Sequence, residues 1–316
     1  VWNQSQQILQ EYGQDFGIYP NPFPSPGPFG DCEEKEKWNK PWKELNRDGK
    51  YYVYDPIVLD LDGDGIETIG SKKYGGALFD HDNDGIKTAT GWVKSDDGFL
   101  VIDRNNDGII NNGSELFGDG TTLKSGNKAT HGYEALAELD SNNDGLIDAK
   151  DEDFLDLKIW RDLNQDGMSQ KSELFTLQEL GVKSLNLSYT DTKKDLAGGN
   201  ILAQISSYET TDGSQKVMGD VNFSFDSFYS RYTDKLTLTE DQKKVVNLSG
   251  MGRLRDLREA ATLSDNLATT LYQYQTANTK EVQMHLLDKL ITAWAKTDPK
   301  YQEGFELLAV HTRTNN

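Results

Sequence analysis

The sequence predicts an α+β protein with three parts: an N-terminal flank at 1–54, a loop-rich module at 55–232 and a helical tail at 233–316. Three observations indicate this fold class. Acidic, glycine-containing segments of one design recur through the middle of the chain. A two-residue alternation of apolar side chains follows them, and a three- to four-residue apolar repeat fills the C-terminal part.

The N-terminal flank is predicted to be a linker. Five of the eight prolines alternate within a nine-residue stretch, at Pro20, Pro22, Pro24, Pro26 and Pro28. Proline cannot donate a ladder hydrogen bond, so this spacing favours an extended, polyproline-like spacer. The aromatic run Tyr51–Tyr54 then predicts a strand that leads into the module.

The whole-chain composition excludes several classes of protein. The chain has 52 acidic and 33 basic residues and a net charge of −19, so a nucleic-acid partner is excluded by repulsion from phosphates. Apolar runs of at most four residues exclude a membrane span. The single Cys32 excludes a disulfide framework or a zinc site with several thiolates. Because the chain opens on Val1, we expect a piece of a longer protein.

Five acidic segments carry aspartate or asparagine at the first, third and fifth places and glycine at the sixth. Such side chains converge on a hard cation, and glycine permits the turn that presents the carbonyl of the seventh residue. All the donors are oxygens, which fits calcium or magnesium and not zinc or copper. The side chains are Asp60, Asp62 and Asp64; Asp80, Asp82 and Asp84; Asp103, Asn105 and Asp107; Asp140, Asn142 and Asp144; Asp162, Asn164 and Asp166.

The loops differ in the carboxylate that would close them. Glu173 stands at the twelfth place of the fifth loop and Asp151 at that of the fourth, with Leu146 and Met168 as the carbonyl donors. The third loop has Glu115 one place later. The first two lack a closer at the twelfth place, although Glu67 is a candidate for the first. Surface turns remain the alternative for these two loops.

These loops predict an EF-hand-like calcium module whose folding depends on the metal. Without cations the clustered carboxylates repel one another, so we expect a loose chain that becomes compact in calcium. Extracellular fluid is rich in calcium, which predicts folding after export.

Elements after the loops are predicted from periodicity. We expect a short helix at Glu173–Leu180 that ends at Gly181, then a strand at 182–189. Segments 201–208 and 216–225 predict a hairpin around 211–214. From Thr239 onward the apolar repeat predicts about three helices, divided at Ser249-Gly250 and Asp298-Pro299.

The bond between Asp55 and Pro56 is chemically special. The Asp side chain can attack its own carbonyl carbon to form a five-membered cyclic anhydride, and the basic proline nitrogen leaves. Proline has no N–H, so the competing succinimide route is blocked. Residue chemistry alone favours an ordinary turn or strand start here and at Asp298-Pro299. Only the acidic loop beginning at Asp60 sets the first bond apart.

The run Asp55–Gly65, the segment Gly113–Asp119 and the last two loops together resemble the self-processing module of FrpC-like RTX proteins, large secreted proteins of Gram-negative bacteria. The resemblance covers 55–232 and implies calcium-triggered, single-turnover cleavage. Asp55 would be nucleophile and acyl donor, and Pro56 the leaving amine. The acceptor would be a lysine amine of another protein or of another copy of the chain.

The resemblance also implies a secreted, extracellular protein, with outer-membrane association as an alternative. The glycine-rich repeats that name the RTX class are not in this sequence, so they are expected elsewhere in the parent protein. A calcium-binding structural or adhesive spacer is the alternative function, and a hydrolase ranks third. The four histidines are scattered, and His81 is expected to be solvated.

Overall fold

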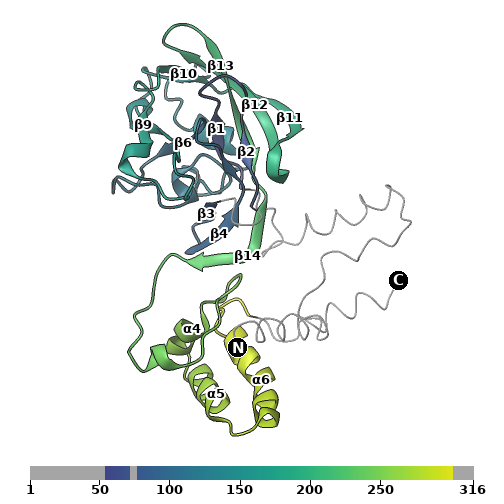
Figure 1. Cartoon of the computed structure of the whole chain (residues 1–316). Helices are drawn as coiled ribbons and strands as arrows, with labels where there is room; N and C mark the ends of the chain where they lie inside the picture. The colour runs from purple at the N-terminus through teal and green to yellow at the C-terminus, as the bar shows by residue number, and fades with distance from the viewer. Residues whose placement is uncertain (1–53, 72–76, 302–316) are drawn as a thin grey trace, which may run out of the picture. The chain divides into compact units, whose positions relative to one another are not determined.

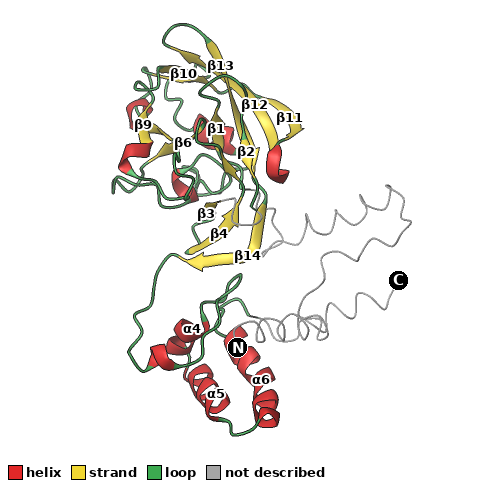
Figure 2. Cartoon of the chain, in the orientation of Figure 1, coloured by secondary structure: helices red, strands yellow, loops and turns green. Residues whose placement is uncertain are grey.

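The computed structural model describes residues 54–71 and 77–301, so the predictions for 1–53 fall outside the described residues. The module is mostly β, and most of the α-helices among the described residues lie in the C-terminal tail (Figures 1 and 2). The prediction of an α+β, EF-hand-like module is therefore wrong. Its acidic loops connect strands or short turns and are not framed by helix pairs.

A nine-stranded antiparallel sheet forms the centre of the module, in the order β7-β10-β12-β13-β1-β6-β8-β9, with β11 also paired to β12. Its strands are β1 (Ile57–Leu59), β6 (Gly98–Ile102), β7 (Leu146–Asp148), β8 (Leu157–Trp160), β9 (Leu174–Thr176), β10 (Val182–Asn186), β11 (Thr190–Asp195), β12 (Ile201–Thr210) and β13 (Gln215–Asn222).

Two smaller sheets and several short helical turns complete the module. One sheet joins β14 (Phe225–Tyr232), β4 (Ile86–Thr90) and β3 (Ala77–Phe79), and the other joins β2 (Thr68–Ile69) to β5 (Trp92–Val93). The helical turns are the short helix α3 (Gly132–Ala137) and the 3₁₀ segments η2 (Gly113–Glu115), η3 (Phe154–Asp156), η4 (Lys171–Glu173) and η5 (Ala197–Gly199); a further 3₁₀ segment, η6 (Gln242–Lys244), lies in the tail.

The central strands bury both of their faces. Along β1, Ile57 and Leu59 face one apolar cluster, which includes Tyr133 of α3. Val58 faces a second cluster, built around Trp92 and other aromatic rings. Because successive side chains of a strand point to opposite faces, a short, fully apolar strand fits this position between two cores.

The predicted hairpin is present, and the predicted short helix is not. Strands β12 and β13 pair along their length through a turn at 211–214, in which Gly213 has a φ of +88°. Glu173–Leu180 instead forms the end of η4, strand β9 and a turn. Leu174 and Phe175 pair with β8, and this sheet pairing replaces the expected helix.

Within its described residues, 233–301, the tail contains three α-helices, α4 (Leu257–Leu263), α5 (Asp265–Thr276) and α6 (Lys280–Ala295). They are divided at Ser264 and Thr279, not at the two predicted breaks. Each of these two side chains accepts an N–H from the first turn of the following helix, as N-caps do. None of the described helices is long and apolar enough to cross a membrane.

Candidate functional site

The five acidic loops share one backbone conformation. The fourth and sixth residues of each have positive φ, and the sixth is always glycine. In the four loops after the first, the leading Asp accepts the N–H groups of the fifth and sixth residues, as Asp162 does from Asp166 and Gly167. In the first loop Asp60 accepts from Gly63 and Gly65. The expected loop geometry is therefore formed, although its helices are not.

The closing carboxylates of the last three loops hold equivalent positions. Glu173 accepts the N–H of Leu163, the second residue of its loop, and that of Gln170, the ninth. Asp151 accepts the matching pair in the fourth loop, from Ser141 and Asp148.

Glu115 accepts the N–H of Asn111, the ninth residue of the third loop, at 2.7 Å. It therefore takes the closing position although it stands one place later in the sequence. The expected carbonyl donors, Leu146 and Met168, each donate their N–H to the Asp of the fifth place.

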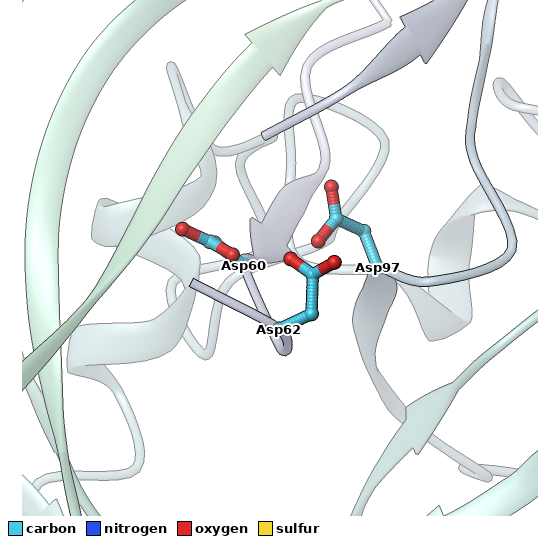
Figure 3. Close-up of side chains that lie close together, drawn as sticks. All are labelled: Asp60, Asp62 and Asp97. Carbon is cyan, nitrogen blue, oxygen red and sulfur yellow. The ribbon is translucent and has the colours of Figure 1, made fainter. Parts of the chain in front are cut away.

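The first loop is closed by Asp97, which sequence reasoning missed. Its two oxygens accept the N–H groups of Leu61 and Glu67 at 3.2 and 2.8 Å. Asp60, Asp62 and Asp97 offer ligand oxygens within 4.8 Å of one another (Figure 3). Asp97 is 1% exposed, and burial raises its pKa to about 7. Glu67, the candidate from the sequence, forms an ion pair with Lys94 instead.

The second loop brings Asp80, Asp82 and Asp84 together, and no fourth carboxylate joins this group among the described residues. Burial raises the pKa of Asp80 to about 6. His81, expected to be solvated, is buried: its ring stacks on Tyr54 at 4.3 Å, and burial lowers its pKa to about 3.

The donor sets fit a hard divalent cation. Each loop turns its oxygens inward around left-handed residues, and buried carboxylates close the first, third, fourth and fifth loops. Oxygen donors in a 12-residue loop of this shape suit Ca²⁺. The loops can thus hold the predicted metal, with Asp97 added to the predicted ligands.

The Asp55–Pro56 bond lies directly before β1, between the isolated bridge of Tyr54 with Phe223 and the start of the strand. Tyr54 and Pro56 accept N–H groups from Phe223 and Val221 through their carbonyl oxygens, at 2.9 and 3.1 Å. On the other side of the chain, Ile57 donates its N–H to the carbonyl of Phe117 at 3.1 Å. The bond is thus fixed on both sides, between β13 and the segment 116–119.

The side chain of Asp55 is buried among acidic groups. It is 6% exposed, and its Oδ1 accepts the N–H of Asp119 at 2.6 Å. Burial, and then repulsion from Asp220 and Asp119, raises the pKa of Asp55 well above its usual range. Asp220 is fully buried on β13, and burial raises its pKa in the same direction.

Gly118 brings the backbone against Asp55. A Cβ at this position would lie 2.9 Å from both the carbonyl oxygen and Oδ1 of Asp55. A side chain here would therefore displace the carboxylate or the peptide that it can attack, so the close approach requires glycine.

Three acidic loops contact the segments around this bond. The first loop begins at Asp60, directly after β1. The second supplies His81, which stacks on Tyr54. Glu115, which closes the third, begins the segment that leads to Asp119. Ordering these loops therefore also orders the surroundings of Asp55.

The second Asp-Pro bond lies in a different environment. Asp298 is half-buried, and its Oδ1 accepts from the guanidinium of Arg253 at 3.2 Å and from the N–H of Lys300 at 2.9 Å. A carboxylate held by arginine is a poor nucleophile, since its charge is already compensated. Only the first bond, among the two, combines burial with neighbouring acids.

This fold and site define a class: a β-sheet module whose calcium-type loops surround a single buried Asp-Pro bond. Residues 57–224, more than half of the chain, match the SPM domain family, and the chain belongs to that family. It is similar to the iron-regulated protein FrpA of Neisseria meningitidis serogroup C, with 57% identity over 270 residues. The match covers 85% of this chain and 24% of FrpA, so the chain spans about a quarter of that relative. Both findings support an RTX-related protein.

Proposed function

We propose that this chain is a calcium-triggered self-processing module that cleaves its own Asp55–Pro56 bond. The observation that carries the proposal is the setting of Asp55. Its carboxylate is buried, fixed by the N–H of Asp119, and packed with its own peptide group against Gly118. The family match and the similarity to FrpA support the same function.

The chemistry begins when the carboxylate of Asp55 attacks its own carbonyl carbon. A five-membered anhydride forms, the C–N bond breaks, and the nitrogen of Pro56 leaves with a proton. Orientation accelerates such a step, since both reacting groups are held before the reaction starts. Asp119 orients the nucleophile, and the hydrogen bonds of Pro56 and Ile57 hold the peptide in place.

Calcium would supply no reacting group and would act by ordering the loops. Without the metal, clustered carboxylates such as Asp60, Asp62 and Asp97 repel one another. The first three loops contact the segments that hold Asp55, so cleavage should follow the ordering of these loops.

The anhydride is an activated acyl group, and water or an amine can open it. We infer that a lysine amine of another protein, or of another copy of this chain, captures Asp55 as an isopeptide. In this proposal the module acts outside the cell, where calcium is abundant, as part of a secreted protein.

Gel electrophoresis of chelated protein tests the proposal. Adding millimolar calcium should convert the 35.5 kDa chain into pieces of about 6 and 29 kDa, while magnesium should do so poorly. Asp298–Pro299 is an internal control that should stay intact. A chain that folds in calcium and is not cleaved would favour the alternative of a calcium-rigidified structural spacer.

A further inference from the structure

Cleavage at Asp55–Pro56 requires a proton for the departing nitrogen, because an amide nitrogen leaves poorly as an anion. The sequence identifies no group for this role. The donor must be acidic, protonated at the working pH and close to the nitrogen, and it must not be the nucleophile itself.

Strand pairing brings Asp220 next to the part of the chain that carries this nitrogen. Asp220 is directly opposite Ile57 in the β1–β13 register. Asp55 and Ile57 are two residues apart, so in the extended chain Asp55, Ile57 and Asp220 project from the same face of the sheet. Pro56 accepts from Val221, which makes this a hydrogen-bonded pair, so the nitrogen of Pro56 also faces β13.

One oxygen of the Asp220 carboxyl accepts a hydrogen bond, and the other has no hydrogen-bond partner among the described residues. Oδ2 accepts the N–H of Gly132 at 2.6 Å. Oδ1 is buried and has no hydrogen-bond partner within 54–71 and 77–301, and the residue is 0% exposed. A buried oxygen without a partner suits a protonated carboxyl, since an ionised oxygen would lack compensation.

The other titratable groups here have different tasks. Asp119 is bound to Asp55 through its N–H, and its charge raises the pKa of both Asp55 and Asp220. Tyr133 donates its hydroxyl to the carbonyl of Met218, and burial raises its pKa. His81 is buried, and burial lowers its pKa to about 3, so at neutral pH it is an uncharged imidazole and not an acid.

We propose that Asp220 is the proton donor for Pro56 in the cleavage step, an inference that rests on the proposed function. As the Asp55 oxygen bonds to the carbonyl carbon, the C–N electron pair moves to nitrogen and takes the proton from Asp220. The products are the anhydride, the free amine of Pro56 and the Asp220 carboxylate. Gly132 then stabilises that carboxylate through the hydrogen bond already in place.

The test compares Asp220→Asn with Tyr133→Phe, which removes a neighbouring hydroxyl and leaves the acid. Asparagine keeps an acceptor for Gly132 and has no acidic proton. Cleavage by Asp220→Asn in calcium should be about 10²-fold slower or more, as for loss of a general acid, while Tyr133→Phe stays within about threefold of the parent.

The pH dependence separates a chemical role from a structural one. The pH profile of the parent rate should be bell-shaped: the rate should rise as Asp55 loses its proton and fall as pH passes the folded pKa of Asp220, and Asp220→Asn should lose only the descending limb. Because the folded pKa lies above the unfolded value, the stabilisation from this proton is lost as pH rises. Asp220→Asn should therefore melt at the same temperature as the parent or higher at neutral pH.

The cleavage rate of Asp220→Asn and the pH profile of the parent decide between the alternatives. An Asp220→Asn variant that cleaves within threefold of the parent and keeps the descending limb would overturn the assignment and leave the proposed function intact. If the variant does not fold in calcium, the parent profile decides: a flat rate at alkaline pH excludes an acid donor. A parent that never cleaves in calcium refutes the proposed function itself.

Discussion

Replacing Gly118 with alanine tests whether the backbone around Asp55 sets the cleavage rate. The new Cβ would lie 2.9 Å from the carbonyl oxygen and Oδ1 of Asp55, and 3.1 Å from its carbonyl carbon. Ordinary carbon contacts begin near 3.4 Å, so Asp55 or Gly118 must move by roughly 0.5 Å.

The expected cost follows from that displacement. A misplacement of about 1 Å typically costs about 10²-fold in rate, so half of it should slow cleavage roughly tenfold, or about 1.4 kcal/mol. Overpacking should also lower the free energy of unfolding by about 1–3 kcal/mol. The assay is the time course of cleavage on gels at saturating calcium, with folding followed by near-ultraviolet circular dichroism.

Gly70→Ala is the matched control. Its Cβ would lie 2.8 Å from the carbonyl oxygen of Gly198, an equal crowding against backbone in another part of the module. It should lower stability by a similar amount and leave the rate of the folded protein unchanged. Equal slowing in both variants, or a parental rate in folded Gly118→Ala, would refute the reasoning.

Three further changes probe the loops and the bond. Asp97→Asn should weaken calcium binding by about tenfold in titration calorimetry, because it removes a charged closing ligand. The control Glu67→Gln should leave the calcium affinity within about twofold of the parent, and equal effects of the two changes would contradict the assignment of Asp97. Glu115→Gln should slow cleavage even at temperatures where the variant is fully folded, since Glu115 closes the loop beside the Asp55 segment. A variant with a lower melting temperature and a parental cleavage rate would contradict the coupling of this loop to the site. Asp55→Asn should not be cleaved on the parental time scale, as followed by mass spectrometry, because it lacks the carboxylate nucleophile; cleavage at the parental rate would contradict the anhydride route.

Local patterns in the sequence predicted the loops and the hairpin well. The first, third, fifth and sixth places of each loop follow a local pattern, in which the leading Asp accepts N–H groups from its own loop, so they can be identified without the fold. The alternation of apolar residues in 201–208 and 216–225 correctly predicted β12 and β13, because this pattern is also a local property of the sequence. The strands that flank the loops could not be predicted from the sequence, because segments such as Leu174–Thr176 take their conformation from pairing with β8.

The residues around Asp55 come from distant parts of the chain, which explains why the sequence did not reveal them. Asp97 closes a loop that begins 37 residues earlier, and no spacing rule connects the two. Asp220 did leave a signal: it is a charged residue inside the apolar stretch Val217–Val221 of β13. Such a residue is almost never fully buried without a reason.

The most direct test of the central claim is intact-mass spectrometry of chelated protein after calcium is added together with excess Nα-acetyl-lysine. Two new species are expected: residues 56–316 beginning at Pro56, and residues 1–55 ending at Asp55, partly as the free acid and partly joined to the added amine. An unchanged chain in calcium, or cleavage at Asp298–Pro299 instead, would contradict the claim.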